Sequence, residues 1–312
     1  MTPTLVCRSN NSAPRSHSAR NGAQRNLKVS SRLAPQIYLG HLSAADAAPT
    51  PVVVKCAGLL QRDASGRLQG PWKEWQAVRQ LRSVAQSHRH VVQVFDTFVQ
   101  HSRVFVVMEH CARGDLLTHL MATQPESRLN QAHAMHIALQ LARGLQFLHH
   151  TCNLAHRDVS LENVFVTRDG VCKLGDFGLS TRADSRASGC VGKPQYVAPE
   201  VVAAASYDPV TADVWSLGVL LFMLLTGAPL LEFASPANPE FHHVQAVGCR
   251  GILEAWHVAD QLSEMTLDLL DKMLAFDPNE RLQTMTDVLN HPAMLAASCR
   301  DSQTREEDEE IV

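Results

Sequence analysis

Two features that often reveal the class of a protein are missing from this sequence: paired cysteines and an excess of charge of one sign. The 312 residues carry a formal net charge of −3, which gives no electrostatic basis for binding nucleic acid. The eight cysteines are scattered, and none stands in a C-x-x-C pair. Scattered cysteines in a chain that opens without a signal peptide indicate reduced thiols in an intracellular protein and argue against a metal site built on cysteines.

A long apolar run is lacking as well. The strongest candidate extends from Val214 to Leu231, but its strongly apolar part, 219–225, is short and is soon followed by Pro229. Since a membrane-spanning helix needs about 20 consecutive apolar residues, the stretch predicts a buried core helix and no membrane span. With 45% apolar residues, the chain can fill one large domain or two lobes.

The two ends of the chain differ in composition from the middle. Residues 1–28 contain five basic residues and no acidic one, and because such a segment cannot bury a core, it predicts a disordered basic tail. The same composition is also typical of an organelle transit peptide, which stays open as the alternative. Residues 298–312 carry the acidic run REEDEEIV, and we expect an acidic tail in solvent there.

Between the tails, the hydrophobic periodicity changes once. From about residue 36 to 108, short β-branched runs such as IYLGHL, PVVVKC and RVFVVM surround one segment with helical spacing, EWQAVRQLRSV. After residue 115 the apolar residues recur at helical intervals, as in Ile137, Leu141 and Leu145. The pattern predicts an α+β protein in which a small lobe, an antiparallel sheet with one helix, precedes a larger and mainly helical lobe.

Several short motifs occur in the order that the protein kinase family uses: VVVK, HRDVSLEN, DFG, APE and DVWSLG. Over residues 29 to 297 the chain therefore resembles a protein kinase. The resemblance implies the two-lobed kinase fold, with the N-terminal lobe at 29–108 and the C-terminal lobe at 109–297. It also implies ATP and Mg²⁺ as cofactors and the transfer of the γ-phosphoryl group to protein substrates.

The resemblance assigns roles to residues in the catalytic motifs. Lys55 would bind the α- and β-phosphates of ATP and pair with Glu74 on the following helix, and Asp158 would act as the base toward the substrate hydroxyl. Asn163 and Asp176 would hold Mg²⁺, because hard cations prefer oxygen ligands. The residues VSLEN resemble the serine/threonine kinases more than the tyrosine kinases, which implies serine and threonine acceptors.

The resemblance also outlines a nucleotide site. MEHCARGDL matches the segment that joins the two lobes in the family, with Met108 as the gatekeeper, backbone groups of 109–111 facing adenine and Asp115 near the ribose. The bulk of Val53 and Phe165 predicts a tighter pocket than is usual in the family. The residues expected to contact the nucleotide are Ile37, Val53, Lys55, Met108, Glu109, Cys111, Asp115 and Phe165.

Other motifs imply structural and regulatory roles in the larger lobe. Glu200 of APE is expected to pair with Arg281 of DPNERL, and Asp213 to hold the backbone of the catalytic loop. A phosphate on a serine between DFG and APE could pair with Arg157 and thereby order this part of the chain. The serines concerned are Ser185 and Ser188, and ordinary loop serines are the alternative.

One departure from the family is the loop that covers the phosphates. Aligning residues 38–40 with the second strand of the family places Ser30, Arg32 and Pro35 where the glycines of G-x-G-x-x-G belong. Glycine lets backbone amides approach the phosphates closely, and proline has no N–H group to donate. We therefore expect weaker or altered ATP binding.

The missing glycines keep two functional interpretations open. The first is an active phosphotransferase, which is favoured because the residues for positioning, base and metal are all retained. The second is a pseudokinase, a folded module that binds partners with weak or no phosphotransfer. The retained residues are Lys55, Glu74, Asp158, Asn163 and Asp176.

The second departure is an exchange of side-chain chemistry between two motifs. The catalytic loop has Ser160 where the family has a lysine that contacts the transferred phosphate, and GKPQYVAPE has Lys193 where the family has a threonine. We expect Lys193 to reach back beside Asp158 and Ser160 and to supply the missing cation. A solvent-facing Lys193 is the alternative.

Overall fold

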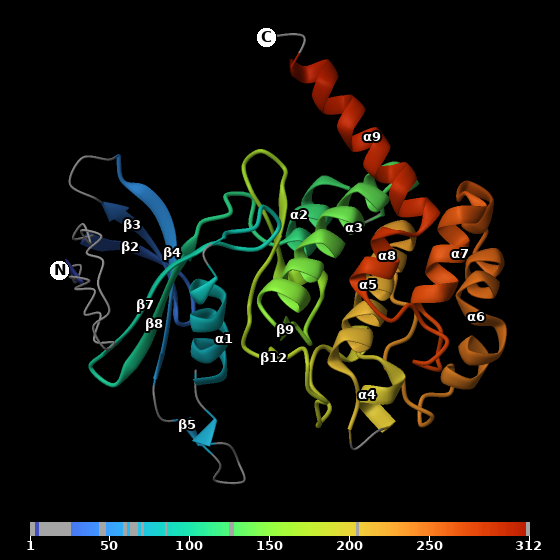
Figure 1. Cartoon of the computed structure of the whole chain (residues 1–312), viewed down its shortest axis with the longest axis horizontal. Helices are drawn as coiled ribbons and strands as arrows, with labels where there is room; N and C mark the ends of the chain where they lie inside the picture. The colour runs from blue at the N-terminus through green and yellow to red at the C-terminus, as the bar shows by residue number, and fades with distance from the viewer. Residues whose placement is uncertain are drawn as a thin grey trace. The chain divides into compact units, whose positions relative to one another are not determined.

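The computed structural model describes residues 4–5, 26–43, 48–58, 61–62, 68–69, 72–84, 86–124, 128–203 and 206–309. The chain divides into two compact units, Met1–Ala85 with Val92–His110 and Gln86–Val91 with Cys111–Val312. The first unit holds the larger sheet and one helix, and the second is mainly helical (Figure 1). The predicted two-lobed α+β fold is therefore confirmed.

The N-terminal unit is built on a six-stranded antiparallel sheet in the order β1-β2-β3-β4-β8-β7. A separate pair of short strands and one helix complete the described part of this unit. The elements are β1 (Thr4–Leu5), β2 (Asn26–Ala34), β3 (Ile37–Ser43), β4 (Thr50–Gly58), β5 (Gln61–Arg62), β6 (Leu68–Gln69), α1 (Trp72–Ser83), β7 (Val94–Gln100) and β8 (Arg103–Glu109).

The boundary of the predicted basic tail is corrected at its C-terminal end. Strand β2 begins at Asn26 and pairs with β3 from that residue onward, and Leu27 is fully buried. The sequence did not indicate a strand here, because within residues 26–28 only Leu27 is apolar and its two neighbours are polar. Thr4 and Leu5 pair with β2, and the rest of the predicted tail lies outside the described residues.

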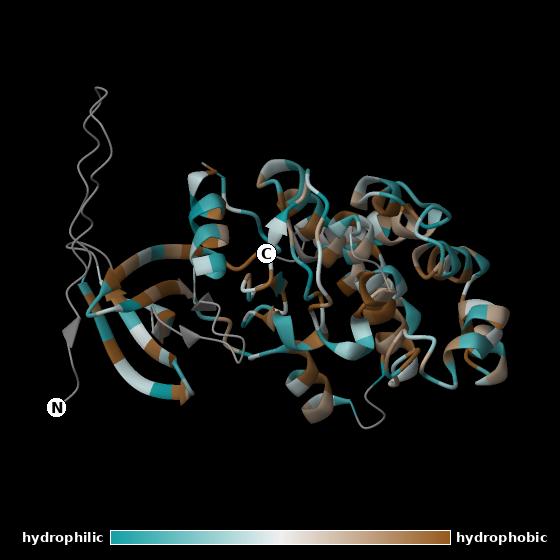
Figure 2. Ribbon diagram, turned by 90° about the horizontal axis from the view of Figure 1, so that it is seen from below, coloured by the Kyte–Doolittle hydropathy of each residue, from teal (hydrophilic) through white to brown (hydrophobic). Residues whose placement is uncertain are grey.

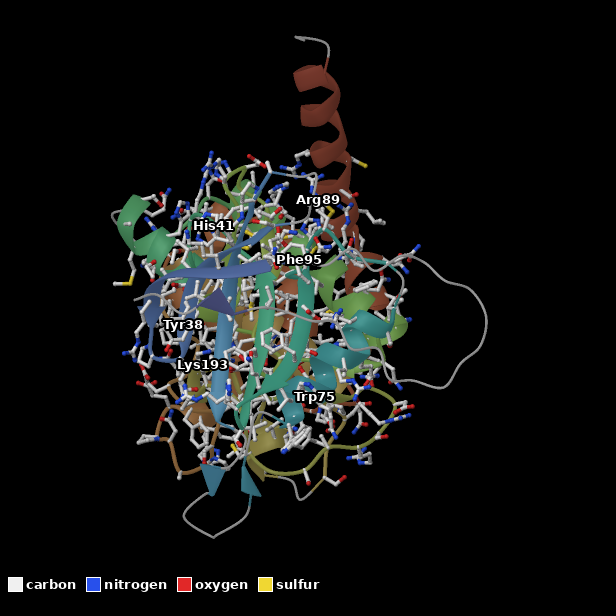
Figure 3. The ribbon with its side chains drawn as sticks, turned by 90° about the vertical axis from the view of Figure 1, so that its left-hand side faces the viewer. Tyr38, His41, Trp75, Arg89, Phe95 and Lys193 are labelled. Atoms are coloured by element: carbon white, nitrogen blue, oxygen red, sulfur yellow. The ribbon has the colours of Figure 1, made fainter. Side chains whose placement is uncertain are left out.

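One face of the sheet forms the core of the N-terminal unit. Successive side chains of a strand point to opposite faces, and Val52, Val54 and Cys56 of β4 all lie on the buried one. Tyr38 and Phe95, both labelled in Figure 3, pack against this cluster. The alternation is visible as brown and pale or teal bands along the strands in Figure 2. The other face of β4 carries the site residues described below.

The described part of the C-terminal unit consists of helices with two short strand pairs and three isolated bridges beside them. Most of the helices begin with a capping side chain; for example, Ser263 accepts a hydrogen bond from the backbone of Thr266 at the start of α7. The helices are α2 (Leu116–Thr123), α3 (Gln131–Gln146), α4 (Pro199–Ala203), α5 (Pro209–Thr226), α6 (Phe241–Ala255), α7 (Glu264–Met273), α8 (Met285–Leu289) and α9 (Pro292–Glu309). The strands are β9 (Leu154–Ala155), β10 (Val164–Val166), β11 (Cys172–Leu174) and β12 (Thr181–Arg182), and the short helical turns are η1 (Phe147–Thr151), η2 (Leu161–Asn163), η3 (Pro194–Tyr196) and η4 (Ala259–Gln261).

Helix α5 is the apolar stretch that resembled a membrane segment. Its 18 residues are long and apolar enough to cross a membrane by length and composition, and 83% of them are buried within the protein. The helix begins at a capping aspartate, Asp208, and ends at Gly227, whose φ of 79° suits glycine. Helix α5 is therefore the central core helix of its unit.

Helix α9 carries the chain from the C-terminal unit into the predicted acidic tail. Its backbone is helical as far as Glu309, so residues 298–309 of the predicted acidic tail continue this helix. Glutamate, glutamine and arginine are good helix formers, which accounts for the helical backbone.

The connection after α1 belongs to the C-terminal unit. The backbone amide of Leu174 donates to the carbonyl of His90 at 3.0 Å, and the His90 ring lies 3.1 Å from the Cys172 carbonyl. The connection passes so close to α3 that a Cβ on Gly144 would lie 2.7 Å from the His90 carbonyl oxygen. Through His90, the connection is anchored on α3 and β11.

This anchor should make folding sensitive to acid. Burial lowers the pKa of His90 to about 4, whereas the unfolded value is about 6.5. Between these two values the unfolded chain binds more protons, so the free energy of unfolding falls as the pH is lowered through that window. From pH 7.5 to 5 the loss from this group should be about 2 kcal/mol.

The measurement is urea unfolding at pH 7.5 and pH 5 for the wild type and His90→Asn. Asparagine can still donate to the Cys172 carbonyl but does not titrate, so its free energy of unfolding should fall less on acidification. His133→Asn, at an exposed position on α3, is the control and should retain the wild-type difference. Equal losses in wild type and His90→Asn would contradict this account.

Candidate functional site

The first pair of predicted site residues meets within the N-terminal unit. Lys55 stands near the end of the buried strand β4, and its ammonium lies 2.8 Å from Glu74 Oε1 on α1. The two side chains are 25% and 10% exposed, so the pair is largely shielded from water and its attraction is less screened than that of a surface pair. A lysine held in this way presents a fixed positive charge.

The sheet aligns further residues on the face that carries Lys55. Ile37 is paired directly with Lys55, and Leu39 with Val53; Val53 is in turn paired with Met108. Directly opposed residues share a face of the sheet, so these side chains form one surface. Leu39 was not among the predicted site residues, although its position two residues after Ile37 on a strand would have indicated it.

The hairpin that should cover the phosphates is closed by residues other than glycine. Strands β2 and β3 are joined at Pro35 and Gln36, and Gln36 has a φ of 64°. The amide of Cys56 donates to the Gln36 carbonyl at 2.8 Å, which helps to hold this strained turn. If the two adjacent x residues of G-x-G-x-x-G form the turn, the glycine positions fall at Arg32, Ala34 and Ile37. Each lies two residues after the position expected from the sequence, which was Ser30, Arg32 and Pro35 in turn.

In the C-terminal unit, Asp158 and Asn163 are hydrogen bonded to each other. The amide nitrogen of Asn163 donates to the Asp158 carbonyl at 2.8 Å and to Asp158 Oδ2 at 2.7 Å. The amide of Gly175 donates to the Asn163 carbonyl at 2.9 Å, which ties the start of DFG to the catalytic loop. Because the Asn163 nitrogen faces Asp158, its side-chain oxygen is the atom left to ligate a cation.

A buried carboxylate fixes the backbone of this loop. Asp213 is fully buried at the start of α5, and its two oxygens accept hydrogen bonds from the amides of His156 at 2.7 Å and Arg157 at 2.8 Å. The His149 ring lies 2.8 Å from the same carboxylate. Arg157 has a φ of 65°, a conformation that costs energy in a residue other than glycine. Asp213 therefore holds the loop in a strained shape, as its motif implied.

Asp176 lies two residues after β11, exposed between the buried residues Gly175 and Phe177. Its φ is 58°, and its Oδ1 accepts from the Gly178 amide at 3.2 Å. The oxygens of Asp176 and Asn163 are the hard donors that Mg²⁺ prefers, and Mg²⁺ typically takes only one or two carboxylates while keeping waters or phosphates. Among the described residues, no group of three or more histidine, cysteine or acidic side chains could hold another metal.

The exchanged pair lies directly beside Asp158. Lys193, labelled in Figure 3, places its ammonium 2.8 Å from Ser160 Oγ and 3.4 Å from Asp158 Oδ2. Its backbone amide donates to Asp158 Oδ1 at 3.2 Å. This approach depends on Gly192, where φ is 101° and a Cβ would lie 2.8 Å from the Arg157 carbonyl. The side chain expected to compensate for the lost lysine thus faces the catalytic loop and not open solvent.

The other residues predicted at the nucleotide site are distributed over both units. Met108 and Glu109 end strand β8, whereas Asp115 caps the N-terminus of α2 with its side chain. The backbones of Asp115 and Phe165 form an isolated antiparallel bridge, and Cys111 is buried. The N-terminal unit therefore holds Ile37, Val53, Lys55, Met108 and Glu109, and the C-terminal unit holds Cys111, Asp115 and Phe165.

Comparison with known proteins agrees with this geometry. The protein kinase domain family matches residues 44–294 of the chain. This chain belongs to the protein kinase family. It is 32% identical over 230 residues to serine/threonine-protein kinase PLK4 of Aedes aegypti, covering 72% of this chain and 28% of that protein.

A plant relative extends the likeness over more of the chain. CBL-interacting protein kinase 4 of Oryza sativa subsp. japonica is 30% identical over 274 residues, which is 86% of this chain and 56% of that protein. PLK4 of Drosophila grimshawi is 35% identical over 213 residues, 67% of this chain and 26% of that protein. The chain thus spans between about a quarter and just over half of the length of these curated relatives.

The kinase domain contains one further predicted pair, which joins the APE helix α4 to the segment after α7. Arg281 donates to Glu200 through two nitrogens, at 2.6 and 2.9 Å. It also donates to the carbonyls of Thr211 and Ala275 and lies over the Trp215 ring, 5.1 Å from its centre. The Arg281 side chain is 0% exposed and Glu200 is 10% exposed. Removal of one partner would leave a buried charge without its counter-ion.

We expect Glu200→Ala to lower the free energy of unfolding by about 3–5 kcal/mol, the range found when one member of a buried ion pair is removed. Urea unfolding followed by circular dichroism measures the change. Glu264→Ala is the matched control, because Glu264 is 81% exposed in its pair with Arg250 and should change stability by less than about 1 kcal/mol. Similar losses in the free energy of unfolding for both variants would show that the Arg281 charge does not require Glu200 as its counter-ion.

Proposed function

We propose that this protein is a serine/threonine kinase that transfers the γ-phosphoryl group of ATP to hydroxyl groups of protein substrates. The observation that carries the proposal is the environment of Asp158. Its carboxylate accepts hydrogen bonds from the Asn163 side chain and from the Lys193 amide and ammonium. A carboxylate held in a fixed orientation is what a base requires to accept the proton of a substrate hydroxyl.

The same proposal gives the other site residues their functions. Lys55 contributes the positive charge that binds phosphate oxygens, and Glu74 keeps its ammonium in place. Asp176 and Asn163 are the residues that would hold Mg²⁺, which when bound offsets the negative charge of the phosphates. The names of the two PLK4 relatives, both serine/threonine-protein kinases, support serine and threonine as acceptors.

Lys193 takes over the function of the lysine that is missing from position 160. Its ammonium reaches both Ser160 and Asp158, so a phosphate in transfer beside Asp158 would meet a cation there. A unit charge about 4 Å from a phosphate oxygen is worth at most roughly 4 kcal/mol at an effective dielectric constant of 20. Because about 1.36 kcal/mol corresponds to tenfold in rate, a chain without this charge would be a slow enzyme.

A pseudokinase is the second candidate, and the β2–β3 hairpin is the observation that favours it. Pro35 lacks an N–H group, and no glycine stands in the turn or at the positions beside it. The hairpin therefore offers fewer amides to phosphates than a glycine-rich loop does. Against this stand five retained residues that a binding module does not need: Lys55, Glu74, Asp158, Asn163 and Asp176.

The place of action is proposed to be inside the cell. Of the seven cysteines that the structure describes, five are buried. Burial raises the pKa of the Cys172 thiol to about 12, which keeps it in its unreactive protonated form. Buried thiols of this kind are typical of proteins that function in a reducing compartment.

The first test of the function is phosphotransfer by the purified full chain to a generic protein substrate with Mg-ATP. Lys55→Met and Asp176→Asn should each reduce the rate at least about a hundredfold, because each removes a charge that acts on the phosphates or their metal. Lys73→Met is the control: Lys73 is exposed on the same helix as Glu74 and should leave the rate unchanged.

The pseudokinase alternative predicts a different pattern. Equal background transfer by wild type and Asp176→Asn, both correctly folded by circular dichroism, would exclude the kinase function. A rise in melting temperature with Mg-ATP in such an inactive protein would identify a nucleotide-binding module, since a ligand at 100 times its dissociation constant stabilises by about 2.7 kcal/mol.

The second test addresses the relocated cation. Lys193→Met keeps the length of the side chain but removes its charge, and it should lower kcat at least about tenfold, with a smaller change in the KM for ATP. Lys272→Met, at an exposed position on α7, is the control. A kcat for Lys193→Met within about twofold of wild type would mean that the ammonium does not act on the transferred phosphate.

A further inference from the structure

The arginine of the catalytic loop has unusual partners. The guanidinium of Arg157 donates to the hydroxyl of Tyr207 through two nitrogens, at 3.0 and 2.6 Å. Its remaining contacts are the carbonyls of Ser188 at 3.1 Å, and Gly189 and Leu179 at 3.4 Å. Within the described ranges, therefore, every hydrogen-bond acceptor of this cation is a neutral oxygen.

Tyr207 is held in place from several directions. It is 2% exposed, and its backbone exchanges two hydrogen bonds of 2.9 Å with Ala187. Its hydroxyl lies 3.2 Å from the Gly189 carbonyl, to which it donates. Burial raises the pKa of Tyr207, so the phenol keeps the proton that it donates. Next to this bridge, Arg186 donates to the carbonyl and hydroxyl of Ser206.

The hydroxyl of Tyr207 thus connects two parts of the site. On one side is Arg157, whose backbone is fixed by Asp213 and which directly precedes Asp158. On the other side is the segment 187–193, which ends at Lys193. The guanidinium and the hydroxyl both reach the carbonyl of Gly189, so a single cluster sets the path of the segment just before Lys193.

We propose that Tyr207 is a positioning residue whose hydroxyl takes the place of an anion at Arg157 and holds the segment 187–193 in order without phosphate. The effect on catalysis rests on the proposed kinase function, whereas the order of the segment does not. Ser188 of this segment and the nearby Ser185 support the proposal. Ser185 Oγ donates to Asp184 at 3.1 Å, and Ser188 offers Arg157 its backbone carbonyl and not its side chain.

The proposal differs from the expectation that phosphate on Ser185 or Ser188 orders the segment through Arg157. The bond from the Arg157 guanidinium to the Tyr207 hydroxyl already has one charged partner. A phosphate would add the attraction between opposite charges, so a phosphate near Arg157 would compete with the Tyr207 hydroxyl. If phosphate were the ordering group, its removal would loosen the segment. If Tyr207 is the ordering group, phosphate removal has no effect and loss of the hydroxyl does.

Hydrogen exchange of the full chain after phosphatase treatment separates the two cases. The reporters are the amides of Ala187 and Lys193, which donate to the Tyr207 carbonyl and Asp158 Oδ1. In Tyr207→Phe, which keeps the ring and the backbone bridge, they should exchange at least about tenfold faster, the effect of losing one hydrogen bond to a charged group. Arg157→Lys should accelerate exchange of the same two amides to a similar extent. In the double variant, these amides should exchange no faster than in either single variant.

Two comparisons make the result decisive. Tyr38→Phe removes a hydroxyl from the N-terminal unit and should leave both amides as in wild type. Ser185→Ala with Ser188→Ala should also match wild type, before and after phosphatase treatment. Faster exchange after phosphatase treatment of the wild type, or unchanged exchange in Tyr207→Phe, would overturn the proposal.

Measurement of kcat tests the positioning role of Tyr207 separately from the proposed kinase function. If the protein is a kinase, Tyr207→Phe should lower kcat about tenfold with little change in the KM for ATP, because Lys193 and Asp158 lose their alignment. A purely structural role would lower the melting temperature but leave kcat per folded molecule unchanged. An inactive wild type in which Tyr207→Phe still loosens the segment would refute the kinase function and retain the positioning role.

Discussion

The catalytic half of the structure depends on one buried carboxylate, Asp213. A fully buried charge is expensive unless hydrogen bonds compensate for it, and Asp213 receives them from two backbone amides and from His149. The same bonds hold Arg157 at a positive φ. The guanidinium of Arg157 contacts the Tyr207 hydroxyl. The next residue, Asp158, accepts hydrogen bonds from Lys193. Without Asp213, neither the base nor the cluster around Arg157 would have a defined position.

This constraint explains how a cation can change its position in the sequence without leaving the site. The catalytic loop and the GKPQY segment are held together by the Lys193 amide, which donates to Asp158 Oδ1, and by the close passage of Gly192 over the Arg157 carbonyl. Since these contacts involve the backbone of both segments, an ammonium can be supplied either from the catalytic loop or from the GKPQY segment. In this chain Ser160 is fully buried, and the charge comes from the facing segment.

Much of the architecture could be predicted from the sequence, because the change in hydrophobic period marks the two lobes and the motifs fix the order of the site. What could not be predicted depends on contacts between distant segments. The sequence suggested a phosphate on Ser185 or Ser188 as one possible partner of Arg157, with ordinary loop serines as the alternative. Tyr207 was not considered, since nothing local connects it to Arg157, fifty residues away. The glycine positions of the β2–β3 hairpin were placed two residues too early, because alignment by one motif does not determine the register of the strands. Leu39 was overlooked although its place on the strand indicated it.

Under the proposed kinase function, the cation that contacts the transferred phosphate resides at Lys193 and not at position 160. The most direct measurement is the kcat for phosphotransfer in Lys193→Thr, in Ser160→Lys and in the double variant that restores the usual arrangement. The account predicts that Lys193→Thr loses at least about tenfold and that the double variant recovers most of that loss, which is strong coupling between the two positions. Effects that simply multiply, with no recovery in the double variant, would contradict it.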